Sequence, residues 1–157
     1  MPKITPFLWF DDKAEEAMHL YVSIFKNSKV LNVTRYGESG PGPKGSVMTT
    51  NFQLDGQDFI ALNGGPMFKF TEAVSFVVNC ETQQEIDEYW QKLSEGGKQD
   101  QCGWLKDRYG LSWQIVPRIL PQLMKKDPAT SNRVMAALMQ MKKLDIAQLQ
   151  EAYDGKA

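Results

Sequence analysis

The stretch DRYGLSWQIVP, residues 107–117, decides how this sequence is interpreted. Its first four residues predict a tight turn, because Asp and Gly favour turn conformations. Residues 111–116 then predict a strand, and the proline that follows ends it. Gln114 is the exception, since this polar amide stands between Trp113 and Ile115 in a strand that otherwise has a buried pattern. The glutamine is either a polar contact on a cavity wall or part of a catalytic site.

The composition is that of a soluble globular protein. The chain has 157 residues, of which 42% are hydrophobic and 24% charged, and this suffices for one core-forming domain and an appendage. A formal net charge of −1 gives no basic surface for nucleic acid or an anionic membrane. No apolar run reaches membrane-spanning length, and the first residues lack the order of a signal peptide, so we expect a cytoplasmic protein.

Reactive side chains are few. Cys80 and Cys102 predict small residues in or near strands rather than a disulfide framework. His19 is the only histidine, so a zinc motif is excluded. Ser75 and Ser112 have no histidine in a recognisable pattern around them, and the sequence therefore offers no nucleophile–base pair.

The expected elements occur in two similar rounds. The first is a strand at 4–10, a helix to about residue 26, a strand at 29–36, a loop at 37–45 and a hairpin around Asp55-Gly56. The second is a strand at 73–79, a helix at 82–97, a short strand near 101–105 and the strand of the opening stretch. A shift of 69 residues superimposes the inward helix positions Ala17, Leu20, Tyr21 and Ile24 on Ile86, Tyr89, Trp90 and Leu93. Each round is therefore a strand, a helix and two or three further strands.

The tail has no strand pattern. Asp127 and Asp145 each predict the start of a helix, because aspartate is a favoured N-cap residue. The methionines of the tail predict packing against the domain or against a partner subunit; they are Met124, Met135, Met139 and Met141. We thus expect a domain at 1–117, with modules at about 1–66 and 71–117, and a helical extension at 118–157.

Five segments carry a family resemblance: FLWFDDKAEEAMHLYVSIF, FIALNGGP, SFVVNC, WLKDRYGLSWQIVP and, in the tail, VMAALMQMKKLDI. Together they resemble the PhnB-like branch of the vicinal-oxygen-chelate superfamily, which also includes glyoxalase I and the extradiol dioxygenases. The branch carries the family name 3-demethylubiquinone-9 3-methyltransferase. The resemblance implies an α+β fold in which paired βαβββ modules form a curved, cup-like mixed sheet, with a C-terminal helical tail. It also implies a homodimer.

The resemblance implies a metal site only in part. Metal-dependent members of the superfamily hold a divalent ion through four His, Glu or Gln ligands, two from each module, around an open position. Carried over to this chain, those positions are about Pro6, Ala61, Ser75 and Gln114. Only Gln114 retains a plausible donor, and a one-residue register change would bring in Thr5, Phe7 or Leu62 without restoring the site. A divalent metal is therefore possible but disfavoured, no other cofactor is expected, and no catalytic residue is identified.

Strand alternation gives the expected lining of the cup. The pocket-lining residues are predicted to be Leu8, Phe10, Ala61, Asn63, Ser75, Val77, Trp104, Ser112 and Gln114. Trp9 and Trp113 are expected on the opposite side, toward the helices. Each polar residue of the set has the alternative of a satisfied internal hydrogen bond.

The function expected from this lining is the binding of a small apolar or aromatic metabolite in the cup, with or without catalysis and without the usual metal. Three alternatives stay open: a metal-dependent lyase or dioxygenase, a methyltransferase as the family name suggests, and a non-catalytic module built around dimerisation. A methyltransferase is disfavoured because no glycine-rich nucleotide loop joins a strand to a helix. Nucleic-acid and membrane partners are not expected.

Overall fold

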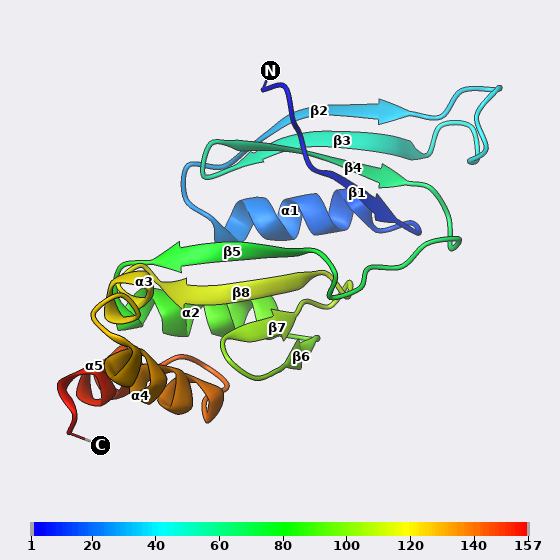
Figure 1. The fold of residues 1–157 in the computed structure, drawn as a ribbon. Coiled ribbons are helices and arrows are strands. Elements are labelled where there is room, and N and C mark those ends of the chain that lie inside the picture. The colour runs from blue at the N-terminus through cyan, green and yellow to red at the C-terminus, as the bar shows by residue number, and fades with distance from the viewer. Residues whose placement is uncertain (1, 157) are drawn as a thin grey trace. The chain divides into compact units, whose positions relative to one another are not determined.

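The structure, a computed structural model, describes residues 2–156 of the chain. The chain divides between Phe70 and Thr71 into two compact units, which we call the first and second unit. Figure 1 shows a helix beside a sheet in each unit, and three further helices in the second. The elements of the first unit are β1 (Phe7–Phe10), α1 (Ala14–Ile24), β2 (Lys29–Arg35), β3 (Val47–Leu54) and β4 (Gln57–Asn63). Those of the second are β5 (Ser75–Cys80), α2 (Gln83–Ser94), β6 (Lys98–Gln99), β7 (Trp104–Lys106), β8 (Ser112–Pro117), α3 (Leu120–Leu123), α4 (Pro128–Met139) and α5 (Ile146–Asp154).

The first unit is one four-stranded mixed sheet with α1 against one face. The strand order is β1-β4-β3-β2, and only the β1–β4 pair is parallel. An aromatic cluster fills the core on the helix side, where Phe52 stacks on Phe59 with ring centroids 5.6 Å apart and Tyr21 of α1 lies beside Phe52. The β3–β4 hairpin turns at Asp55 and Gly56, whose φ angles of 48° and 79° confirm the predicted type I′ turn.

The second unit repeats this plan with shorter strands. Its order is β5-β8-β7-β6, and again only the pair at one edge, β5–β8, is parallel. Buried side chains of α2 and of the sheet form its core; they include Ile86, Trp90, Leu93, Trp113 and Ile115. Thr82 caps α2 by accepting a hydrogen bond from the Glu85 backbone N–H at 3.1 Å.

The tail adds a small helical core to the second unit. Its buried apolar residues are Leu123, Val134, Met141, Leu144, Leu149 and Ala152. The predicted caps are confirmed, because Asp127 accepts from the Thr130 N–H at 2.7 Å and Asp145 accepts from the Gln148 N–H at 3.0 Å. Of the tail methionines, Met141 is buried, whereas Met135 and Met139 are exposed.

The predicted α+β class, with two βαβββ modules and a helical tail, is confirmed. The strand expected near 101–105 differs in detail, because residues 100–103 form a turn between the two short strands β6 and β7. No helix among residues 2–156 is long and apolar enough to cross a membrane.

Candidate functional site

Gln114 lies on the face of the second unit's sheet that is opposite α2, which we call the helix-free face. Its neighbours along the strand, Trp113 and Ile115, point the other way into the core and are 3% and 0% exposed. A polar amide in this strand therefore does not interrupt the core.

Two rows of side chains cross the helix-free face. The upper row consists of Trp104, Gln114 and Val77, which are paired across β7, β8 and β5. The lower row consists of Lys106, Ser112 and Ser75, paired in the same way. Because residues directly opposite on neighbouring strands share a face, these six side chains lie together. Five of the nine predicted pocket-lining residues are thus brought together on one sheet.

Hydrogen bonding in the rows is incomplete. Gln114 Nε2 donates to Ser75 Oγ at 2.9 Å, and no described residue donates to Gln114 Oε1. Ser112 is 0% exposed, and its hydroxyl has no hydrogen-bond partner within residues 2–156. Val77 is 49% exposed, while Trp104 and Gln114 are half-buried. The upper row is therefore an accessible apolar and aromatic strip with one unused amide acceptor.

An ion pair borders the lower row. Lys106 Nζ lies 2.7 Å from the Glu72 carboxylate. The hydrogen bond from Lys106, and then its positive charge, hold the pKa of Glu72 below its usual value. In return the same hydrogen bond raises the pKa of Lys106. Both shifts favour the charged forms of the two side chains.

The turn before β8 is organised by Asp107, which is 2% exposed. Its Oδ1 accepts from the backbone N–H groups of Tyr109 at 2.9 Å and Leu111 at 3.1 Å. Its Oδ2 accepts from the indole N–H of Trp113 at 2.9 Å. One carboxylate thus fixes both the turn and the side chain of Trp113, the first aromatic core residue of β8. This sets the register that points Gln114 away from α2.

In the first unit the expected orientation is wrong. Leu8, Phe10 and Ala61 are 6%, 4% and 0% exposed and lie in the core on the α1 side, together with Phe52. Trp9 consequently points away from α1, where its ring meets Phe68 edge-on with centroids 4.9 Å apart and its indole N–H donates to the Gly65 carbonyl.

The strands of the first unit face the other way because the connection from strand to helix differs by one residue between the two units. Three residues separate β1 from α1, but only two separate β5 from α2. The helices therefore match at a shift of 69 residues, whereas the strands match at a shift of 70. A one-residue change moves every strand side chain to the other face. The residue of the first unit that corresponds to Gln114 is Ile60, which pairs with Phe7, and not Ala61.

Asn63 has a structural environment. Its Oδ1 accepts from the Ala14 N–H at 2.8 Å, its Nδ2 donates to the Val47 carbonyl at 3.2 Å, and its own carbonyl accepts from the Tyr36 hydroxyl. The side chain thereby caps α1, for which Lys13 provides no side-chain cap. This is the satisfied internal hydrogen bond that the sequence left as an alternative.

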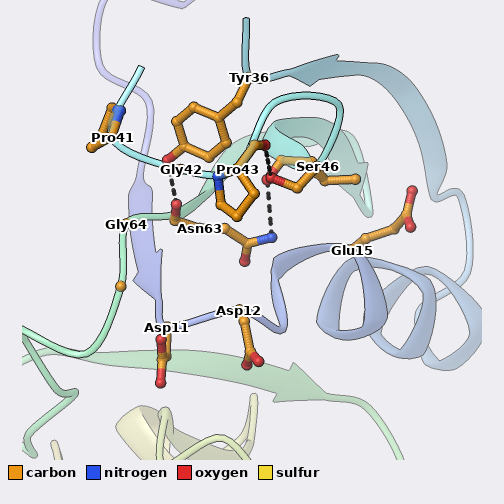
Figure 2. Close-up of a pocket in the computed structure, with 12 residues that line it drawn as sticks. Asp11, Asp12, Glu15, Tyr36, Pro41, Gly42, Pro43, Ser46, Asn63 and Gly64 are labelled. Carbon is orange, nitrogen blue, oxygen red and sulfur yellow. Dashed lines mark hydrogen bonds between the residues drawn. The ribbon is translucent and has the colours of Figure 1, made fainter. Parts of the chain in front are cut away.

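Asn63 also borders a pocket that the sequence did not predict. The pocket has a volume of about 460 Å³ and lies between the start of α1 and the Gly- and Pro-rich loop after β2 (Figure 2). Its wall is formed by Asp11, Asp12, Glu15, Tyr36, Pro41, Gly42, Pro43, Ser46, Val47, Asn63, Gly64 and Gly65. The Tyr36 ring lies so close to Gly40 and Gly42 that a Cβ atom at either would overlap it. The only indication of this pocket in the sequence is the Gly- and Pro-rich composition of the 37–45 loop.

The positions that correspond to the metal ligands of the superfamily do not carry a suitable set of donors in this chain. Across residues 2–156, no three His, Cys, Asp or Glu side chains are grouped so that they could hold an ion. Ser75 and Gln114 offer neutral oxygens, and Ile60 supplies no donor on the corresponding strand of the first unit. His19 is exposed on α1. A hard divalent cation prefers carboxylate and imidazole donors, so the residues present do not fit it.

The cysteines offer no activated nucleophile in the described region. Cys80 is buried, and desolvation raises the pKa of its thiol to about 12. It is therefore protonated at neutral pH, and a thiol reacts far more slowly than a thiolate. Cys102 is half-buried in the turn before β7, and both cysteines are free.

Comparison with known proteins finds this fold in several solved structures. A PhnB protein from Bacillus cereus has 41% sequence identity and a TM-score of 0.68 over 74% of this chain and 99% of its own. A Pseudomonas aeruginosa protein has 20% identity and a TM-score of 0.62 over 74% of this chain and 98% of its own. A third structure is a mutant of the fosfomycin resistance protein FosX from Listeria monocytogenes, in complex with Mn(II) and a dihydroxypropylphosphonic acid. It has 13% identity and a TM-score of 0.52 over 73% of this chain and 92% of its own. The last two likenesses concern the fold alone.

The family follows from the sequence match. Residues 2–116 match the family described as 3-demethylubiquinone-9 3-methyltransferase, and the chain belongs to this family. The resemblance to its PhnB-like members is confirmed. The family match ends at residue 116. The resemblance noted in the sequence includes the tail, and the match does not extend that far. No curated protein matches the chain.

Proposed function

We propose that the helix-free face of the second unit binds a small organic molecule with an apolar or aromatic body. The observation that carries this proposal is the upper row, in which the half-buried Trp104 and the exposed Val77 flank a glutamine whose Oε1 has no donor among the described residues. Pockets for small molecules typically combine apolar walls with a few polar groups that fix orientation. The Gln114 Nε2 donates to Ser75 Oγ, and this hydrogen bond orients the amide. Gln114 Oε1 is then left to accept from a ligand hydroxyl or N–H.

The proposal does not require a divalent metal. FosX is recorded with Mn(II), but the corresponding strands of this chain carry Ser75, Gln114 and Ile60, which provide no anionic donor. Metal analysis of the purified protein tests this point. A stoichiometric divalent ion that is lost in Gln114→Ala would instead support a metal-dependent lyase or dioxygenase.

The family name suggests a methyltransferase as a second function. Calorimetry with S-adenosylmethionine tests it directly, and the proposal expects no heat of binding. A saturable isotherm with one site per chain would overturn this expectation and would make methyl transfer the leading function.

Ligand binding is tested by NMR titration of the ¹⁵N-labelled protein with 2-naphthol, which combines an aromatic body with one hydroxyl donor. The signals of the Trp104 indole, the Gln114 side-chain amide and the Val77 backbone should shift together and saturate. Gln114→Ala should weaken binding about three- to tenfold, because a hydrogen bond to a neutral group contributes about 0.5–1.5 kcal/mol. Gln148→Ala, at an exposed position of α5, is the matched control and should leave the affinity unchanged. Shifts confined to other residues would contradict the proposal.

We also propose that the protein is a homodimer, because the exposed Met135 and Met139 lie one turn apart on α4 and could cover a partner's surface. Light scattering coupled to size-exclusion chromatography should give twice the chain mass. A monomer at micromolar concentration would contradict this.

A further inference from the structure

The tail contacts the module at one defined place. Residues 141–146, which comprise most of the connection from α4 to α5 and the first residue of α5, run past the first turn of α2 and the turn between β6 and β7. We call them the connecting segment. This connecting segment lies outside the family match, which ends at residue 116. Its Leu144 is 0% exposed and belongs to the core of the tail.

Gln83 of α2 holds the connecting segment with both ends of its amide. Its Nε2 donates to the Leu144 carbonyl at 3.0 Å, and its Oε1 accepts from the Ile146 N–H at 2.8 Å. Beside it, Lys143 Nζ lies 2.8 Å from the Asp87 carboxylate. Hydrogen bonds from Lys143 and then from Gln83 lower the pKa of Asp87. The amide satisfies two backbone groups that would otherwise have no partner between two helices.

The connecting segment also pairs with the turn that precedes Trp104. The backbone N–H of Cys102 donates to the Met141 carbonyl at 2.7 Å, and that of Gly103 donates to the Lys142 carbonyl at 2.8 Å. Cys102 and Gly103 have φ angles of 62° and 84°, an unusual left-handed pair that requires external support at a non-glycine residue.

Gly103 links the tail to β8. Its carbonyl accepts from the N–H of Ile115, the residue after Gln114, at 2.8 Å. A Cβ atom at Gly103 would lie 2.9 Å from the Ile115 carbonyl oxygen and 3.1 Å from the Leu144 side chain. Only glycine allows the tail, the turn and β8 to approach so closely.

We propose that the tail is an intramolecular clamp that fixes Trp104 opposite Gln114, with Gln83 as the positioning residue. The strands alone provide little support, because β6 has two residues and β7 has three, and such short strands are marginal. Release of the tail would remove the acceptors of the Cys102 and Gly103 N–H groups. Trp104, which follows them, would then no longer be held in place. Because the upper row is the ligand site of the proposed function, tail docking and ligand binding are then coupled.

The test compares Gln83→Ala with Gln150→Ala. Both replace a glutamine in a helix by alanine, but the Gln150 side chain donates to Asp154 within α5, at 3.3 Å, and has no other side-chain hydrogen bond among residues 2–156. In Gln83→Ala, amide hydrogen exchange at Cys102 and Gly103 should accelerate tenfold or more. The Trp104 indole and Gln114 side-chain signals should move, and the affinity for 2-naphthol should fall about fivefold, which is at the lower end of typical coupling. Gln150→Ala should leave all three measurements unchanged.

A structural role of the tail would give a different result. If exchange at Cys102 and Gly103 accelerates while the Trp104 and Gln114 signals stay in place, the tail only stabilises the fold and the clamp is overturned. If the signals move but the wild-type protein does not bind 2-naphthol, the clamp stands and the proposed function fails. Should Gln83→Ala not fold, Lys143→Ala removes only the ion pair with Asp87 and should shift the same signals by a smaller amount.

Discussion

The two units share one topology but stabilise it differently. In the first unit, β2, β3 and β4 have seven, eight and seven residues and pair along most of their length. In the second unit, β6 and β7 are short, and backbone groups of the turn between them pair with the tail. The faces opposite the helices also differ, since Phe7, Trp9 and Ile60 occupy the first where Val77, Asn79 and Gln114 occupy the second. The same order of elements can therefore provide an entirely apolar face in one unit and a face that also carries amide side chains in the other.

The largest expected effect concerns the register of β1. Leu8 is 6% exposed on the α1 side, whereas Phe7 next to it is 55% exposed on the other face. Leu8→Ala should lower the free energy of unfolding by about 2–5 kcal/mol, because it leaves a cavity in the core. Phe7→Ala should cost less than about 1 kcal/mol, as most surface changes do. Urea denaturation of both variants measures the difference, and the reverse ranking would restore the orientation expected from the sequence.

The sequence predicts those features of the fold that depend on neighbouring residues. The Asp55-Gly56 turn, the two aspartate caps of the tail and the inward face of each helix are all read from local spacing. The orientation of β1 was missed because it depends on the single extra residue between β1 and α1, and a helix pattern does not reveal it. In the second unit, where the alternation was anchored on Gln114 itself, the expected face is the one observed.

Long-range contacts explain the rest of what was missed. Asn63 caps α1 from 49 positions away, and Gln83 holds Leu144 and Ile146 from more than 60 positions away. An amide side chain in a sequence carries no sign of which distant backbone group it will meet. The pocket beside Tyr36 depends in the same way on the packing of the 37–45 loop, whose composition predicts a loop but not its shape.

The second prediction compares the aspartates of two turns. Asp107 is buried, and its carboxylate accepts from the backbone N–H groups of Tyr109 and Leu111 and from the Trp113 indole. Asp55 lies exposed in its hairpin. Asp107→Ala should lower the free energy of unfolding by roughly 2–4 kcal/mol, because it leaves a buried indole N–H without an acceptor. Asp55→Asn should have little effect, since asparagine also adopts positive φ. Thermal unfolding and the Trp113 indole signal are the readouts, and an unshifted indole signal in Asp107→Ala would contradict the assignment.

The third prediction compares the caps of the two module helices. α2 has a local cap in Thr82, while α1 depends on the distant Asn63, which also bonds the Val47 carbonyl. Thr82→Ala should cost about 1 kcal/mol, as is typical for loss of an N-cap. Asn63→Ala should cost roughly 1–3 kcal/mol, because partly buried groups on two other elements lose their partner. Denaturation midpoints of both variants provide the test, and equal costs would show that Asn63 acts as a cap alone.

The smallest expected effect is the pH dependence of the ion pairs. The pKa of Glu72 is held below its usual value of 4.5 by Lys106, so folding favours the charged carboxylate. The stabilisation is complete above that usual value and disappears as the pH falls through the lowered pKa of the folded protein. At the alkaline end the contribution of Lys106, whose pKa is raised, is lost as the pH rises through its folded value. Glu72→Gln should therefore flatten the acid side of a plot of stability against pH. Glu38→Gln is the matched control, because the pair of Glu38 with Lys44 in the first unit is 81% and 69% exposed and water screens such pairs. An equal change in both variants would show that the ion pair of the second unit does no more than an ordinary surface pair.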